Sequence, residues 1–304
     1  EQIAGYQILL EDICLEVVQD SALYTEGWDT LAQPAFWQQI MRIGPDTTLV
    51  NIAKTRQIVG YIDTYNWMLR SEKRKKKYED SIRNVYGLKA KDEIYFTHGR
   101  SHFYRIQAML PAIDQAIEVF REEEVDPWYA QTILLIESPG RLQHSIDGAY
   151  GAFQLMEGVA KEMGLVINDT IDERADFHKS AKGAARLIDR VCLPHTRALC
   201  RKWGLGYRED EIWFRLLTMH VYHAGIGNVR RVMRKVRPDT GGVPLFKSLW
   251  QKKSRRFGNA SQNYSQIALA ALLELDVVLS RTGILCPPDE ERISQGDSAD
   301  SFLP

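Results

Sequence analysis

The 304-residue chain is short of cysteine and of long apolar runs. Its longest apolar run, residues 267–273, ends at Glu274, far short of the roughly 18 residues that a membrane-spanning helix needs. Neither a C-x-x-C pair nor an H-E-x-x-H motif occurs, so the spacing of ligand-type residues gives no zinc site. The composition also excludes collagen-like, coiled-coil, disulfide-scaffold and mostly disordered proteins.

The four cysteines are too few to define a cellular compartment. Cys192 and Cys200 lie close enough in sequence to pair in an oxidising compartment. Free cysteine, however, is among the residue types that proteins bury most readily. We therefore expect Cys192 and Cys200 to be buried thiols.

Charge of neither sign dominates, because 39 Lys+Arg face 40 Asp+Glu and the net charge is −1. The distribution is uneven, since residues 137–264 hold 22 basic and 13 acidic side chains. Between Arg230 and Arg256, ten basic residues stand against Asp239 alone. A basic segment of this kind raises the local concentration of polyanions, among them anionic glycans and nucleic acids.

Hydrophobic periodicity predicts helices through almost the whole chain, so the expected fold class is all-α. In the first part, residues 3–23 follow a period close to 3.6, and Asp46 or Thr47 is placed to cap a helix that reaches residue 62. Asp126 followed by Pro127 marks another helix start. Further helices are expected at residues 105–123, 158–163, 175–191, 209–222 and 264–279.

Three parts are predicted along the chain: an N-terminal helical region at residues 1–105, a helical domain at 106–285, and a polar tail or linker at 286–304. The tail is rich in Pro, Ser and Asp, which is typical of linkers and disordered ends. The first residue is Glu1 rather than Met, so we expect any signal segment or lipid anchor to precede this sequence.

Glu137 stands at the end of a strongly apolar helix. Residues 133–136 are all apolar, and Pro139 ends the helix shortly after Glu137. Burial and the negative end of the helix dipole both raise the pKa of a carboxyl group in this place. A carboxyl that stays protonated near neutral pH is suited to act as a general acid. The segment alone leaves open the alternative that Glu137 faces water.

The loop that follows has the composition of a ligand-binding wall. Residues 145–156 read SIDGAYGAFQLM. Gly148 and Gly151 permit tight turns and the close approach of a ligand, and the Gln154 carboxamide can donate and accept hydrogen bonds with sugar hydroxyl and acetamido groups. We interpret this loop, beside a lone acid, as one wall of a polymer-binding cleft.

Four motifs in order resemble those of the peptidoglycan lytic transglycosylases, whose domain is related to goose-type lysozyme. They are ES at Glu137, SxxGAxGxxQLM from Ser145, YHAGIGNV from Tyr222 and NY at Asn263. The similarity covers about residues 115–280 and is greatest to the membrane-bound type D group, where a segment like residues 49–67 precedes the domain. The resemblance implies a mainly α, lysozyme-like domain with a substrate cleft.

The resemblance also implies a reaction. Glu137 would be the single catalytic acid/base, cleaving the bond between N-acetylmuramic acid and N-acetylglucosamine to give a 1,6-anhydromuramyl product. Ordinary glycosidases need two carboxylates, but here the nucleophile belongs to the substrate and one carboxylate suffices. No metal and no cofactor would be required.

Matching to the family's motifs implies the residues that hold the glycan. Ser138 would support Glu137, and the Tyr264 hydroxyl would orient it. The substrate-binding set implied in this way is Ser138, Ser145, Gln154, Met156, Tyr222, His223 and Tyr264. Packing of aromatic rings between helices remains the alternative for Tyr222 and Tyr264.

Two positions depart from the family's pattern, because Glu157 stands where the family has Pro and His223 where it has Asn. An imidazole donates and accepts as an amide does, but in another geometry. These departures leave two alternatives open. In the first, Glu157 or Asp147 acts as a second carboxylate, and the protein is a hydrolytic muramidase. In the second, the altered cleft binds glycan without cleaving it. A solvated acid is the simpler interpretation of both carboxylates.

The resemblance implies peptidoglycan strands as the partner, the periplasm or envelope of a Gram-negative bacterium as the location, and a monomer. It also implies association with the outer membrane through an N-terminal anchor outside this sequence. The basic segment lies between the YHAG and NY motifs, so we assign it to anionic glycan, and we expect no nucleic acid. The run Lys73 to Lys77 is interpreted as a solvated helix face.

Overall fold

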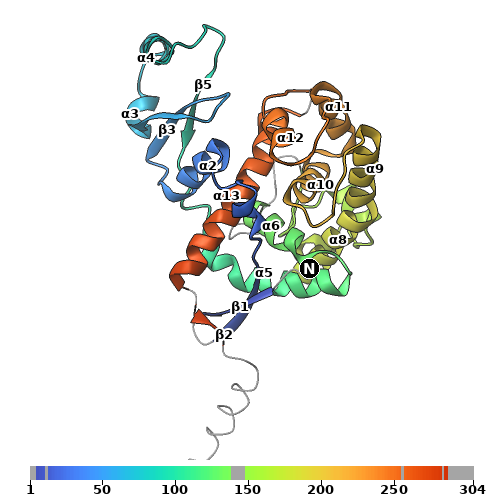
Figure 1. Cartoon of the computed structure of the whole chain (residues 1–304). Helices are drawn as coiled ribbons and strands as arrows, with labels where there is room; N and C mark the ends of the chain where they lie inside the picture. The colour runs from blue at the N-terminus through green and yellow to red at the C-terminus, as the bar shows by residue number, and fades with distance from the viewer. Residues whose placement is uncertain (1–4, 11–12, 138–147, 255–256, 283, 287–304) are drawn as a thin grey trace, which may run out of the picture.

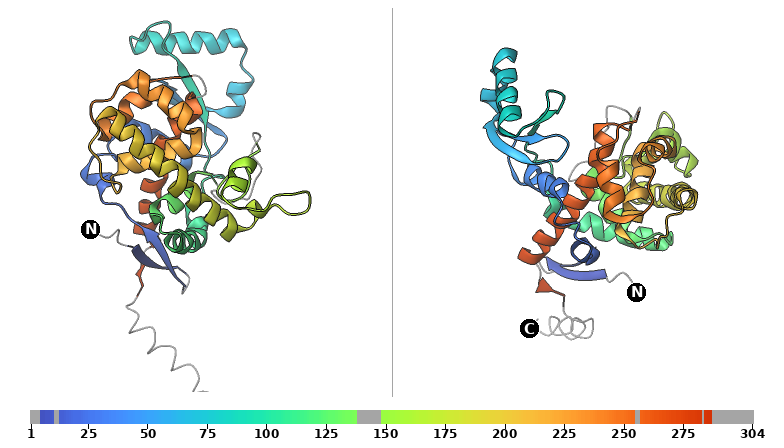
Figure 2. Two further views of the ribbon diagram at one scale, coloured as in Figure 1. Left: turned by 90° about the vertical axis from the view of Figure 1, so that its right-hand side faces the viewer. Right: turned by 45° about the horizontal axis from the view of Figure 1, so that its top comes forward.

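The structure is a computed structural model that describes residues 5–10, 13–137, 148–254, 257–282 and 284–286 (Figure 1). The fold is mainly helical, as predicted, but it also contains two small antiparallel sheets. One sheet lies near the termini, and the other projects beside the helices (Figures 1 and 2). The expectation of an entirely α-helical chain is therefore wrong for the N-terminal region.

The helices of the second part form where amphipathic or apolar periodicity predicts them. α5 covers the expected 105–123 segment, and α13 extends the expected 264–279 helix at both ends. The helices from α5 onward are α5 (Ile106–Glu122), α6 (Pro127–Glu137), α7 (Glu157–Glu162), α8 (Phe177–Leu187), α9 (Leu193–Trp203), α10 (Ile212–Ala224), α11 (Ile226–Val236), α12 (Gly242–Leu249) and α13 (Asn259–Thr282). Two short turns, η1 (Glu173–Ala175) and η2 (Ile188–Cys192), flank α8.

The first sheet joins the two ends of the described chain. β1 (Gly5–Leu10) pairs with β2 (Ile13–Val18) in an antiparallel hairpin, and β6 (Ile284–Leu285) pairs with the other edge of β1. The helix predicted over residues 3–23 is therefore wrong. In β2, Leu15 and Val17 are buried on one face while Cys14 and Glu16, on the other face, are half-buried, so this part of the strand alternates with a period of 2.

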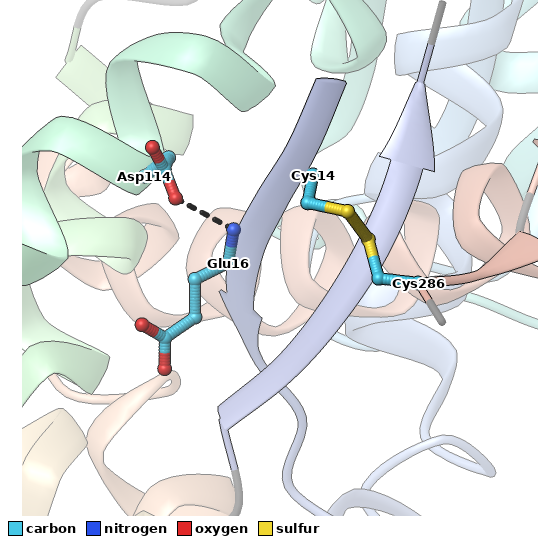
Figure 3. The surroundings of a disulfide bond; sticks show 4 residues. All are labelled: Cys14, Glu16, Asp114 and Cys286. Atoms are coloured by element: carbon cyan, nitrogen blue, oxygen red, sulfur yellow. Dashed lines mark hydrogen bonds between the residues drawn. A yellow bond between two sulfur atoms is a disulfide. The ribbon is translucent and has the colours of Figure 1, made fainter. Parts of the chain in front are cut away.

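A disulfide between Cys14 and Cys286 crosses this sheet (Figure 3). The two cysteines are 272 positions apart, and the sequence contained no signal for their pairing. Two positions after Cys14 on β2, the Glu16 backbone N–H donates to Asp114 Oδ1 at 2.6 Å (Figure 3). This bond fixes the sheet against α5. Cys192 and Cys200 are buried and free, which confirms the expectation of buried thiols.

The second sheet replaces the helix predicted over residues 46–62. β3 (Thr47–Ile52) is its central strand, with β4 (Ile58–Asp63) and β5 (Ile94–His98) antiparallel on either side. Thr, Val and Ile are frequent in β3 and β4, and such β-branched residues favour strands. The cap residue is Asp63 rather than Asp46, because its Oδ1 accepts from Asn66 N at 2.7 Å and starts α3 (Thr64–Met68).

The charge run belongs to α4 (Glu72–Val85). Lys73, Arg74, Lys76 and Lys77 are exposed, which confirms the interpretation as a solvated helix face. Helices α3 and α4 lie between β4 and β5 in the chain and complete a small α/β unit with the second sheet (Figure 1).

A continuous buried cluster runs from Ile8 to Leu279 and includes residues of both halves of the chain. α1 (Ala22–Thr25) and α2 (Ala32–Arg42) lead into it. α2 packs on α13: Trp37 Nε1 donates to Gln266 Oε1 at 3.2 Å, and Arg42 pairs with Glu274 at 2.5 Å. The buried cluster includes residues from both sides of residue 105, and the division of the chain there stays a prediction. Within the described residues, no helix is both long and apolar enough to cross a membrane.

Candidate active site

The start of α6 determines where Glu137 lies. Asp126 Oδ1 accepts from Trp128 N at 2.9 Å, and Pro127 occupies the first helical position, as predicted. Every residue from Trp128 to Ile136 is buried. The helix therefore runs through the protein interior and presents Glu137, its last residue, at the edge of the core.

Glu137 has an unusual pKa for a carboxyl group. Its side chain is half-buried, and desolvation raises the pKa of Glu137 to about 7, while the Tyr264 hydroxyl acts in the opposite direction. Near neutral pH, the protonated and ionised forms are therefore both populated. A group in this state can donate a proton in one step and accept one in the next.

Three tyrosines lie around this carboxyl group. The charge of Glu137 contributes to the raised pKa of Tyr104, Tyr222 and Tyr264, although burial is the larger cause for each. Tyr222 comes from α10 and Tyr264 from α13. Tyr104 precedes α5 and lies outside the four motifs, so the sequence pattern contains no signal for its place beside Glu137.

The hydroxyls of Tyr222 and Tyr264 are held differently. The Tyr222 hydroxyl donates to the Phe153 carbonyl oxygen at 2.6 Å and so ties α10 to the loop after α6. The Tyr264 hydroxyl is buried, and no described residue binds it with full hydrogen-bond geometry. It nevertheless lies close enough to Glu137 to lower the pKa of the carboxyl.

His223 covers Tyr264. The two rings are stacked, with centroids 4.1 Å apart and planes 16° from parallel. His223 is an exposed residue, but desolvation of its ring lowers the pKa of His223 to about 4. The neutral imidazole, which can donate one hydrogen bond and accept another, therefore predominates at neutral pH.

A cavity of about 250 Å³ brings five of the predicted residues together. Glu137 lies at its wall with Gln154, Met156, Tyr222 and His223, and the other lining residues are Ala149, Leu155, Val159 and Leu187. These side chains come from α6, α7, α8, α10 and the loop before α7. Glu137 is the sole carboxylate among the described residues that line this cavity.

The loop before α7 is shaped by Gly151 and Arg174. Gly151 has φ +81°, and a Cβ atom there would lie 1.9 Å from the Arg174 carbonyl oxygen. The Arg174 guanidinium donates to the carbonyls of Gly148 at 3.0 Å and Leu155 at 3.1 Å and pairs with Asp172 at 2.6 Å. Arg174 therefore holds both ends of the segment 148–155, a role that the sequence pattern did not indicate.

Gln154 and Met156 occupy different positions in this loop. Gln154 has φ +48°, and its Nε2 donates to the Gly151 carbonyl at 2.9 Å, so the carboxamide helps to brace the turn. The Met156 side chain is 45% exposed and directly precedes α7. Ser138, Ser145 and Asp147 lie outside the described residues.

Glu157 is a surface residue. It forms an ion pair with Lys161 at 2.6 Å on α7, and this contact holds the pKa of Glu157 below its usual value. It does not line the cavity that contains Glu137. This placement agrees with a solvated acid at a helix start.

A buried polar chain supports the site from behind. His220 Nε2 lies 2.9 Å from Ser265 Oγ, and Trp250 Nε1 donates to the same oxygen at 2.9 Å. Burial lowers the pKa of His220 to about 3, so this ring is neutral. The contacts fix α10 against α13 directly beside Tyr264 and about one turn from His223.

The basic segment forms an exposed surface on α11, α12 and the chain that follows. Its exposed side chains are Arg230, Arg231, Arg234, Lys235, Arg237, Lys247, Lys252 and Lys253. Lys253 pairs with Glu93 at 3.2 Å, whereas Arg255 and Arg256 lie outside the described residues. No group of acidic, His and Cys side chains in the described part of the chain is arranged to hold a metal ion.

Comparisons of the chain with protein-family models, with curated proteins and with solved structures found no match.

Proposed function

We propose that the protein is a peptidoglycan lytic transglycosylase with a lysozyme-like helical domain. The observation that carries this proposal is the pairing of two properties in Glu137: a pKa of about 7 and its place as the sole carboxylate among the described residues of the cavity. A reaction that uses one group first as acid and then as base needs this combination.

The reaction has two proton transfers through one carboxyl. Protonated Glu137 gives its proton to the glycosidic oxygen as the bond from that oxygen to C1 of the muramyl sugar breaks, and the electron pair leaves with N-acetylglucosamine. Ionised Glu137 then takes the proton of the muramyl 6-hydroxyl while that oxygen forms the new bond to C1. Glu137 ends protonated, and no water is consumed.

The surroundings of Glu137 favour both steps. Burial keeps a useful fraction of the acid form at neutral pH, and the Tyr264 hydroxyl stabilises the ionised form. Neutral His223 and the Gln154 carboxamide supply donors and acceptors for sugar hydroxyl and acetamido groups. The partner is a peptidoglycan strand, attracted by the exposed basic segment, and the protein acts as a monomer in the bacterial envelope.

The placement of Glu157 weighs against the hydrolytic alternative. A second carboxylate that positions water must face the scissile bond, but Glu157 is exposed and paired with Lys161. A protein that only binds glycan has no need of a proton donor and acceptor, so the raised pKa of Glu137 favours cleavage over binding alone.

Digestion of purified sacculi followed by mass spectrometry tests the proposal. Wild type releases muropeptides lighter by one water than reducing products, and Glu137→Gln releases none while keeping the wild-type circular dichroism spectrum. Glu157→Gln is the matched control and keeps its activity. Reducing products would identify a muramidase, pelleting with sacculi without products would identify a binding protein, and unchanged turnover by Glu137→Gln would remove Glu137 from the mechanism.

A further inference from the structure

A second cavity, of about 210 Å³, lies between the β4-β3-β5 sheet and the first turns of α13. Figure 1 shows this sheet beside the N-terminal end of α13. Most of the lining residues carry polar side chains: besides Ala53 and Trp250, the walls contain Gln33, Lys54, Arg56, Lys91, Asp92, Glu93, Tyr95, Gln251, Lys253, Asn259, Gln262, Asn263 and Gln266. The proton-transfer chemistry at Glu137 uses none of these residues.

Arg56 is the deepest cation of this cavity. It lies in the turn between β3 and β4 with φ +60° and is only 5% exposed. Its guanidinium lies over the rings of Phe36, Trp37 and Tyr95, with 5.1 Å to the nearest centroid. Burial lowers the pKa of Arg56 to about 10, so the group is still a cation at neutral pH.

Among the described residues, this buried cation has neutral hydrogen-bond partners only. Arg56 donates to the carboxamide oxygens of Asn51 at 3.2 Å, Asn259 at 3.4 Å and Asn263 at 2.5 Å. In the described part of the chain, no carboxylate forms an ion pair with it. Buried charges in proteins are ordinarily paired, so the cavity retains an uncompensated positive charge.

The groups around Arg56 add donors rather than acceptors. Because the carboxamide oxygens of Asn259 and Asn263 accept from Arg56, each amide keeps its N–H groups for a ligand. The two acids of the wall are engaged, since Glu93 binds Lys253 and the Tyr95 hydroxyl and Asp92 accepts from the Lys89 N–H. Lys54 and Lys91 are exposed at the rim.

We propose that this cavity binds a carboxylate of the muramyl-peptide part of peptidoglycan, an inference that rests on the proposed function. A guanidinium flanked by amide N–H donors matches the planar, two-oxygen shape of a carboxylate. Consecutive residues of α13 connect the two sites, because Asn263 lines this cavity and Tyr264 lies beside Glu137. The carboxylate comes either from the stem peptide or from the lactyl group of a peptide-free muramyl unit.

Binding is measured on the full-length Glu137→Gln protein by isothermal titration and amide NMR, so that no turnover interferes. The probes are a stem tripeptide with free carboxylates, the same tripeptide with carboxamides in their place, and the peptide-free disaccharide. A free-acid ligand binds about tenfold or more tightly than its carboxamide form and shifts the Asn263 side-chain resonances. The tripeptide or the disaccharide, whichever binds, identifies the source of the carboxylate.

Arg56→Gln reduces this binding by a similar factor, whereas Arg201→Gln leaves it unchanged. Arg201 is exposed on α9, which Figure 1 places on the other side of the molecule from the sheet. If Arg56→Gln fails to fold, the protein with an unaltered cavity still tests the inference, because the acid and amide ligands can be compared on it. Equal binding of acid and amide, or no binding of either probe, overturns the inference.

The two proposals fail separately. Anhydro products from the wild type without binding of any free-acid probe would remove the carboxylate site and leave the transglycosylase. Acid-dependent binding at Asn263 without products would retain the site and remove the activity.

Discussion

The ring of His223 lies flat on the ring of Tyr264, 4.1 Å from centroid to centroid, and Tyr264 in turn lies against Glu137. A neutral imidazole thus covers the group that tunes the candidate acid. The imidazole forms part of the cavity wall, while burial and the Tyr264 hydroxyl set the pKa of the carboxyl.

The raised pKa of Glu137 predicts how stability changes with pH. A carboxyl whose pKa is raised to about 7 on folding contributes stability at low pH, and this contribution is lost as the pH rises through about 7. Glu137→Gln removes the titration, so above pH 7 the variant is more stable than wild type by about 1–3 kcal/mol after allowance for partial exposure. Urea unfolding at pH 4 and pH 8 measures the difference, which should be small at pH 4, where the carboxyl is largely protonated in the folded and the unfolded chain alike. A constant difference at both pH values would contradict the assigned pKa.

Tyr264→Phe should alter the pH profile more than the fold. The hydroxyl lowers the pKa of Glu137, so its removal raises that pKa and moves the basic limb of the activity profile to higher pH. Stability should change by less than about 1 kcal/mol, because no described residue binds the hydroxyl with full geometry.

Tyr222→Phe is the matched control for that experiment. It loses the 2.6 Å bond to the Phe153 carbonyl and leaves that acceptor unpaired, which costs about 1–3 kcal/mol. The two variants are compared by thermal unfolding and by sacculus turnover from pH 5 to pH 9. A larger loss of stability in Tyr264→Phe than in Tyr222→Phe would contradict the hydrogen bonding described here.

Gly151→Ala should disrupt the loop of the site. The substitution forces a Cβ atom to 1.9 Å from the Arg174 carbonyl and requires φ +81°, so the backbone must shift. We expect a loss of stability of at least about 1–2 kcal/mol together with loss of activity. Gly158→Ala on α7 meets no atom within 4 Å and should be neutral or stabilising by up to about 1 kcal/mol. Similar melting temperatures for the two variants would refute this account.

The cysteines should separate into two classes on chemical labelling. Cys192 and Cys200 are buried, and burial raises the pKa of each thiol to about 12, so the folded protein should react slowly with a thiol reagent. Denaturation without reductant should expose two thiols, because Cys14 and Cys286 are joined. Four reactive thiols under those conditions would show that the disulfide does not form.

Cys14→Ser should destabilise the folded protein through the same bond. A link between residues 272 positions apart restricts the unfolded chain strongly, and disulfides of this kind contribute about 2–4 kcal/mol. Cys200→Ser does not remove a crosslink and serves as the control for loss of a sulfur atom. Equal urea midpoints for oxidised and reduced wild type would exclude a stabilising role.

The sequence predicted the helices from residue 105 onward because they are long and their apolar residues recur with a helical period. It failed for the strands β1 to β5, because short segments such as β2 and β3 fit both a helical and an alternating pattern. In such segments, packing against α5 and pairing with neighbouring strands decide the structure.

Residue type and local order alone determined that Glu137 ends an apolar helix and that a glycine-containing loop with Gln154 follows it. Only the tertiary structure decided which distant groups surround that carboxyl: Tyr104, Tyr222 and Tyr264 come from separate elements, and Arg174 holds the loop from outside the motifs. The pairing of Cys14 with Cys286 and the place of Arg56 among three aromatic rings were likewise decided by the tertiary structure alone. The physical reason is that burial and charge–charge distances, which set a pKa, depend on contacts between segments far apart in the chain.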